Sequence, residues 1–375
     1  MTPCSSLARL AKQRQSSSMT PEIRDPALVL SLMTAVALFT GTQYKRQTPQ
    51  TDLRGNRPRI TITDRRIIKN GSSTGTYNEA PSVVEASDGD YLLSYNVGPD
   101  HVTAYYHALR RSRDKGVRWS PEVAQWSATT PDPTLARAPV SGDTIISFAK
   151  LNFAGLTGAA YSRSSDSGYT WSGFTFFDDP VNNTFSTPTQ YLIDGLNMYA
   201  PGYDGQALNA NLWFSQDDGY MWTKLSTINQ PGDASINETG IAQIGPTRML
   251  AISRDTVNTH TWGHISEDLG LTWGPQIDYT PQVGVLDLPQ LLQIENALLL
   301  FGRNGLANEL LVFASYDGGK TFTDRTVLDT YTGEGIDGGY CWPLLRRDGK
   351  IFLVYYADSE GLRKPDIKSL VLKWK

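Results

Sequence analysis

The sequence is poor in the residues from which metal and disulfide sites are built. Its 375 residues include only two cysteines, Cys4 and Cys341, and four scattered histidines. Two cysteines do not make a disulfide framework, and no Cys/His group has the spacing of a zinc site. We therefore expect neither a metal nor a cofactor.

Strong charge of one sign and long helical patterns are missing as well. Lys and Arg number 34 against 38 Asp and Glu, which gives a net charge of −4, and no basic stripe occurs. Nucleic-acid-binding proteins concentrate Lys and Arg on one face, so we expect no nucleic-acid partner. Turn formers and aromatic residues are frequent instead, with 33 Gly, 21 Pro, 9 Trp, 18 Tyr and 12 Phe. This composition is typical of an all-β protein.

One long stretch, Pro26–Tyr44, carries no charge. Its apolar core is short for a membrane span but suits the apolar region of a signal peptide or a marginal signal anchor. No convincing A-x-A cleavage site follows it, and a buried or partner-docking helix is the alternative. We interpret residues 1–57 as a targeting or anchor segment with a linker. This predicts a protein that is secreted or attached to a membrane or particle through residues 26–44, and a soluble protein otherwise.

Five copies of one signature, S-x-D-x-G-x-x-(Trp/Phe), organise the rest of the chain. They are Ser112–Trp119, Ser164–Trp171, Ser215–Trp222, Ser266–Trp273 and Ser315–Phe322, and their aspartates are 52, 51, 51 and 49 residues apart. A fixed period near 50 residues with strand-like runs in every copy indicates a β-propeller. Ser and Asp bond to nearby backbone and Gly permits positive φ, so each signature predicts a turn between strands. We assign these aspartates a structural role.

The period predicts a single six-bladed β-propeller over residues 58–375, which we expect to be monomeric. The alternating run Arg59–Lys69 is expected to complete the last blade and close the ring. The repeats cover about 78–127, 128–180, 181–230, 231–280, 281–330 and 331–375. Apolar runs expected to form their second strands lie at 90–96, 143–150, 196–202, 248–254, 296–303 and 350–358. The last repeat ends in Asp366–Trp374, a predicted third strand.

Equivalent positions of the blades surround one axis, so polar residues there converge from distant parts of the chain. Alignment on the turns before the second strands brings Glu79, Glu238 and Tyr340 to matching positions. Two carboxylates and a phenol supply the proton donor, nucleophile and base that hydrolysis requires. The alternatives are glutamates bonded to backbone at strand ends and a tyrosine packed between blades.

The signatures, their period and the flanking segments resemble the sialidase superfamily of Asp-box proteins. Segment Asn237–Arg254 is similar to the sialidase stretch in which a Glu precedes, by sixteen residues, an Arg that binds the substrate carboxylate. Segment Gly338–Tyr356 resembles the one that carries the nucleophilic Tyr. The resemblance implies that Tyr340 is the nucleophile, Glu238 its base and Arg254 a substrate ligand. A phenol suits an acidic sugar, because the sugar's negative charge would repel a carboxylate nucleophile.

Other family positions match this sequence less well. The loop before the first signature lies where sialidases carry their acid/base Asp, and Asp100 matches best, with His101 adjacent as a possible substrate contact; a turn-forming role for Asp100 is the alternative. Sialidases open their first blade with R-x-P, whose Arg is one of three that clamp the carboxylate, but Glu79 stands there and would repel an anion. Arg303 lies in the blade of the third clamp Arg, about four residues early. Arg137 imitates the motif in the wrong blade.

These observations favour a sialidase-like exo-glycoside hydrolase that removes a terminal acidic or polar sugar from a glycan. Related propellers cleave neutral glycans such as arabinan, and in that variant Glu79 and Glu238 would act as the carboxylate pair. The alternative for Glu79 is a substrate-binding role, in which its carboxylate contacts sugar hydroxyls. A non-catalytic glycan-binding or scaffold propeller is the alternative from another class. A hydrogen bond between Tyr340 and Glu238, about 2.6–3.2 Å long, would support the enzyme.

Overall fold

A computed structural model describes residues 60–374, except 102, 104, 122–123, 128–132, 154–155, 178–187 and 204–208. The chain separates into two compact units, Met1–Arg46 and Gln47–Lys375, and every described residue belongs to the second. The expected targeting segment, residues 1–57, lies outside the described residues. Within those residues, no helix is long and apolar enough to cross a membrane.

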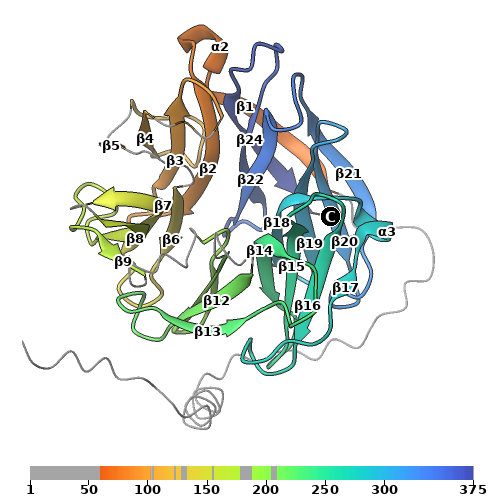
Figure 1. Ribbon diagram of the computed structural model, residues 1–375. Coiled ribbons are helices and arrows are strands. Elements are labelled where there is room, and N and C mark those ends of the chain that lie inside the picture. Colours follow the sequence, from red (N-terminus) through yellow and green to blue (C-terminus); the bar gives the residue numbers. More distant parts are fainter. Residues whose placement is uncertain are drawn as a thin grey trace, which may run out of the picture. The chain divides into compact units, whose positions relative to one another are not determined.

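The described residues form six four-stranded antiparallel sheets arranged as the blades of a propeller (Figure 1). The first blade contains β2 (Tyr77–Glu85), β3 (Tyr91–Gly98), β4 (Tyr106–Ser112) and β5 (Ala124–Ser127). The second contains β6 (Thr134–Arg137), β7 (Thr144–Phe153), β8 (Leu156–Ser164) and β9 (Thr175–Phe176). The third contains β10 (Leu192–Asp194), β11 (Asn197–Tyr203), β12 (Ala210–Ser215) and β13 (Thr223–Thr227). The fourth and fifth contain β14 (Ile236–Gln243), β15 (Met249–Asp255), β16 (Thr261–Ser266) and β17 (Ile277–Asp278); and β18 (Asp287–Ile294), β19 (Ala297–Asn304), β20 (Glu309–Ser315) and β21 (Thr323–Thr330). The predicted all-β, six-bladed fold is confirmed.

The last blade joins the two ends of the propeller. It contains β22 (Gly338–Leu345), β23 (Ile351–Ala357), β24 (Asp366–Lys373) and, on the outside, β1 (Thr61–Lys69). Strand β1 pairs antiparallel with β24 from Thr61 opposite Lys373 to Lys69 opposite Ile367. The predicted closing strand is therefore confirmed. Two single-turn helices, α2 (Gly71–Thr74) and α3 (Thr280–Val283), lie in connections between blades.

All five signatures form the same turn after the third strand of a blade. In the second blade, Ser164 Oγ donates to Asp166 Oδ1 at 2.7 Å and accepts from the Gly168 N–H at 2.7 Å, while Asp166 Oδ1 also accepts from the Thr170 N–H at 2.8 Å. The same three bonds recur in the other four copies. These aspartates hold turns together, as their sequence pattern predicted.

The apolar core lies largely between neighbouring blades. Between the fifth and sixth blades, Leu299, Phe301 and Leu310 pack with Leu353 and Tyr355, and all five are fully buried. Each such side chain contributes about 1.5–3 kcal/mol by leaving water. Packing of this kind fixes the blades around the axis and so positions the first strands that carry the candidate site.

Candidate active site

Two of the predicted catalytic residues lie inside β-bulges of first strands. In β14, Ile236 pairs with Asp255 and Thr239 with Ser253, so the two residues between them face Arg254 alone. In β22, Gly338 and Cys341 are paired in the same way and leave Gly339 and Tyr340 unpaired. A bulge changes the direction of a side chain relative to the regular pleat. Glu238 and Tyr340 occupy the same place in their bulges, as predicted.

The predicted equivalence of Glu79 with these two residues is wrong. Glu79 is paired with Asn96 and precedes the bulge of β2, which contains Ala80 and Pro81. Its true counterpart is Asp287 in β18, which is paired with Arg303 before the bulge of the fifth blade. Counting back from the turns misplaced Glu79, because the stretch between bulge and turn is one residue shorter in β2 (Ser82–Glu85) than in β14 (Thr239–Gln243) and β22 (Cys341–Leu345).

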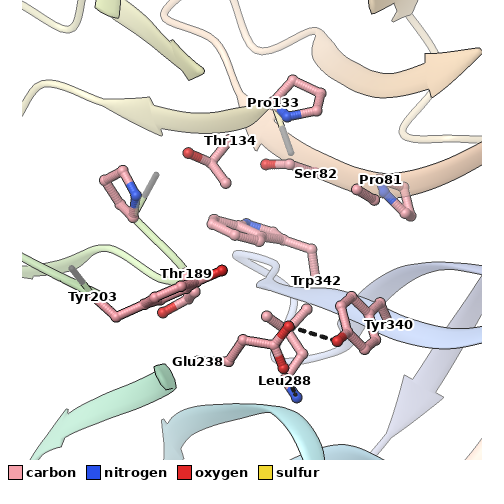
Figure 2. A pocket seen from close by; sticks show the side chains of 12 residues that line it. Pro81, Ser82, Pro133, Thr134, Thr189, Tyr203, Glu238, Leu288, Tyr340 and Trp342 are labelled. Carbon is pink, nitrogen blue, oxygen red and sulfur yellow. Dashed lines mark hydrogen bonds between the residues drawn. The ribbon is translucent and has the colours of Figure 1, made fainter. Parts of the chain in front are cut away.

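Glu238 and Tyr340 meet across the propeller. Tyr340 Oη donates a hydrogen bond to Glu238 Oε1 at 2.5 Å (Figure 2). The other carboxylate oxygen accepts from the Leu288 N–H at 3.0 Å and from Arg254 Nη1 at 3.2 Å. Arg254 Nη1 also donates to Tyr340 Oη at 3.1 Å. The expected contact is present between residues 102 positions apart, and it includes Arg254.

A second arginine lies beneath the phenol. The guanidinium carbon of Arg303 is 4.1 Å from the centre of the Tyr340 ring. Arg303 Nε and Nη2 contact Asp287 Oδ2 at 2.9 and 2.8 Å, and the side chain is only 3% exposed. Arg254 Nε lies 3.0 Å from Asp287 Oδ1, while its N–H is directed to Asn258 Oδ1 at 2.6 Å. Asp287 therefore stands between both guanidinium groups.

Sequence reasoning missed Asp287. The available signal was its place in the triplet Asp287-Leu288-Pro289, which mirrors Glu79-Ala80-Pro81 in the first blade. A carboxylate two residues before a proline in two first strands marks the position that precedes a bulge.

These neighbours shift the pKa values of the site in opposing directions. Burial raises the pKa of Tyr340 well above its ordinary value and Glu238 adds to the rise, whereas Arg303 and Arg254 act to lower it. Burial alone would lower the pKa of Arg254, but Glu238, Tyr340 and Asp287 outweigh it and the pKa is raised. The phenol therefore keeps its proton at rest and shares it with a carboxylate, between two permanent cations.

The dyad borders a hollow of about 470 Å³, a volume that includes the space at its mouth (Figure 2). All six blades contribute to its lining, which consists of Ala80, Pro81, Ser82, Pro133, Thr134, Pro188, Thr189, Tyr203, Glu238, Leu288, Tyr340 and Trp342. The hollow thus lies where the blades converge. Its lining is apolar, aromatic and hydroxyl-bearing, and Glu238 is its one charged member.

No family model and no curated protein matches this sequence. Solved structures do match it. A protein of unknown function from Dyadobacter fermentans superposes with a TM-score of 0.69 at 18% identity, over 84% of this chain and 99% of that one. The Hadza microbial sialidase Hz136 has a TM-score of 0.60 at 17% identity, over 81% of this chain and 67% of that one. The Penicillium chrysogenum α-L-arabinanase, complexed with arabinobiose, has a TM-score of 0.59 at 13% identity, over 83% of this chain and 98% of that one. The chain therefore shares the fold of these solved structures, which include a sialidase and an arabinanase.

Four residues that the sequence analysis considered, His101, Glu79, Asp100 and Arg137, are absent from the lining of the hollow. His101 Nδ1 lies 2.7 Å from Glu79 Oε2, and Glu79 is 5% exposed. Asp100 is exposed and forms an isolated bridge with Thr103. Arg137 pairs with Thr144 beside the β6–β7 turn, at the end of β6 away from Thr134 of the lining.

The structure therefore brings together Tyr340, Glu238, Arg254 and Arg303. It does not bring Asp100 or Glu79 to the lining. In the part of the propeller that the structure describes, no three His, Cys, Asp or Glu side chains are grouped to hold a metal ion.

Proposed function

We propose that the protein is a glycoside hydrolase that removes a terminal sugar bound in the hollow, with Tyr340 as nucleophile and Glu238 as its base. The observation that carries this proposal is the 2.5 Å hydrogen bond from Tyr340 Oη to Glu238 Oε1 at the wall of the hollow. A nucleophile held within hydrogen-bond reach of a base is the arrangement that covalent catalysis needs.

In the first step, Tyr340 Oη bonds to the anomeric carbon while its proton passes to Glu238 and the glycosidic oxygen departs. Arg254 Nη1, 3.1 Å from Oη, and Arg303 beneath the ring stabilise the negative charge that develops on the phenol oxygen. In the second step, water attacks the anomeric carbon, and the phenol oxygen recovers the proton from Glu238. Two displacements retain the anomeric configuration.

The departing oxygen also needs a proton donor. In the second step the same group, now deprotonated, acts as the base that activates water. The resemblance to sialidases offers Asp100 for both tasks. Because Asp100 is exposed and outside the lining, this role requires the loop that carries it to approach the hollow when a glycan binds.

The enzyme class draws support from neighbours of the same fold that are named as a sialidase and an arabinanase. Fold alone does not select a substrate, so the proposal depends on the dyad and its surroundings.

The test is hydrolysis of a panel of aryl glycosides and sialosides by the wild type and by Tyr340→Phe. Loss of the nucleophile is expected to lower kcat by at least about 10³-fold. Tyr356→Phe is the matched control, because this tyrosine packs against Tyr340 with ring centres 6.0 Å apart and loses only a hydroxyl. The change removes the hydroxyl's hydrogen bonds to the Ile336 carbonyl and to Arg303 Nη1, and activity should stay within about tenfold.

Glycan binding without turnover, unchanged in Tyr340→Phe, would replace the enzyme with a non-catalytic glycan-binding propeller. Undiminished hydrolysis by Tyr340→Phe would show that another group attacks the sugar.

A further inference from the structure

The charges beside the hollow are already balanced without a ligand. Two carboxylates, Glu238 and Asp287, face two guanidinium groups, Arg254 and Arg303, at 2.8–3.2 Å. Three of these four side chains are less than 12% exposed, and Arg254 is 19% exposed. An anionic ligand here would add a negative charge to a set that has no excess of cations.

Most N–H groups of the two arginines already contact protein atoms. Arg303 places Nε and Nη2 on Asp287, and its Nη1 lies 3.4 Å from both the Gly338 carbonyl and Tyr356 Oη. Arg254 gives Nη1 to Glu238 and Tyr340 and its Nε–H to Asn258. A sugar carboxylate could engage Arg303 only by displacing a partner that the protein supplies, and at Arg254 it could reach only Nη2 without doing so.

We propose that Asp287 excludes carboxylate-bearing sugars, so that the hollow accepts an uncharged terminal sugar. This inference rests on the proposed function and names its substrate class. The Asp287 carboxylate fills, between the two guanidinium groups, the position that an anionic ligand would need. Burying a further carboxylate beside Glu238 and Asp287, without a third cation to balance its charge, is unfavourable.

The remaining walls of the hollow fit a neutral sugar. The first-blade side contributes Ala80, Pro81 and Ser82, with no cation. Trp342 and Tyr203 supply aromatic faces for the C–H groups of a sugar ring, and Ser82 and Thr134 supply hydroxyl groups. The dyad serves such a sugar equally well, because the phenol proton moves to Glu238 whatever the charge of the substrate.

The test compares two probes that differ in one charge: the methyl α-glycoside of N-acetylneuraminic acid and the methyl ester of the same sugar. Binding to the full-length protein is measured by titration calorimetry. The wild type should bind the ester at least tenfold more tightly than the acid. In Asp287→Asn, which keeps the size of the side chain, affinity for the acid should rise at least tenfold while affinity for the ester stays within a factor of three.

Asp194→Asn is the control for net charge, because Asp194 lies in the third blade at the β10–β11 turn and outside the lining. It should leave both affinities unchanged. Tighter binding of the acid by the wild type would overturn the inference, and this comparison decides even if a variant fails to fold. A folded Asp287→Asn protein without a gain for the acid would also overturn it. Neither readout involves turnover, so the outcome is separate from that of Tyr340→Phe.

Discussion

Single residues in different blades of this propeller have opposite tasks. Asp287 holds charged groups at the site, whereas His107 in β4 is kept neutral in an apolar layer. His107 is fully buried, 4.7 Å from Phe148 between ring centres, and its Nδ1 lies 2.5 Å from Asn96 Oδ1. Burial lowers its pKa to about 3. Folding therefore resists protonation at this residue.

This gives a pH prediction for His107→Gln. Above the unfolded pKa of about 6.5, His107 is neutral in both states and its stabilisation is complete. Between pH 6.5 and about pH 3, His107 is protonated in the unfolded chain but not in the folded chain, so the free energy of unfolding decreases as the pH is lowered. The wild-type free energy of unfolding should fall more steeply than that of His107→Gln, by up to about 1.4 kcal/mol per pH unit.

Urea unfolding from pH 8 to pH 4 measures both proteins. Their difference at pH 8 gives the packing cost of the substitution, and only the change of that difference with pH reports the titration. Parallel curves would show that His107 takes up its proton in the folded state as readily as in the unfolded one.

At the scale of one element, the signature turn also locks neighbouring blades together. Gly168 has φ +88°, and a Cβ added there would lie 2.4 Å from Leu92 Cδ1 of the first blade. Gly116 and Gly319 show the same close approach to Phe352 and Leu250 of the adjacent blades. The glycine is needed both for its backbone conformation and for the space it leaves to the next blade.

We predict that Gly168→Ala lowers the free energy of unfolding by about 2–4 kcal/mol, the sum of positive-φ strain and overpacking. Gly173→Ala is the matched control five residues away, since a Cβ there meets no atom within 4 Å and φ is not positive. Denaturant unfolding of both variants measures the difference. Equal stabilities would contradict the interlocking role of the turn.

At the scale of the whole molecule, the ring depends on a strand that comes from the beginning of the propeller. Strand β1 covers the outer edge of β24, and Arg65 in it donates to the Leu328 carbonyl of the fifth blade at 2.8 Å. Without β1, the edge of β24 would expose unpaired backbone groups, which promotes association between molecules.

A chain that begins at Asn70 is therefore expected to unfold at a temperature lower by about 5 °C or more than a chain that begins at Ile60, and to scatter more light. The longer chain is the control, because it lacks the same preceding residues but keeps β1. Scanning calorimetry and light scattering measure the two effects. Identical melting would mean that the blade is stable with three strands.

The fold and part of the site could be predicted because their signals are local or repeated. The five signatures and a sixth repeat that lacks one predicted the number of blades, and the turn that the signatures encode forms as expected. Alignment on the turns and the resemblance to sialidases singled out Glu238, Arg254 and Tyr340, and the structure brings these three side chains together. Glu79 was misplaced because the distance from bulge to turn differs between blades, which only the strand pairing shows, and Asp287 was missed although its triplet mirrors that of Glu79.

The sequence by itself determined the architecture, since the period near 50 residues repeats one strand-and-turn unit until it closes on β1. Only the tertiary structure decided the electrostatic balance of the site. Glu238, Asp287 and Tyr340 come from three different blades, and their distances follow from how those blades pack around the axis. The energy of a Coulomb interaction depends on distance in space and not on distance along the sequence. The pairing of Asp287 with two arginines therefore became visible only in the folded chain.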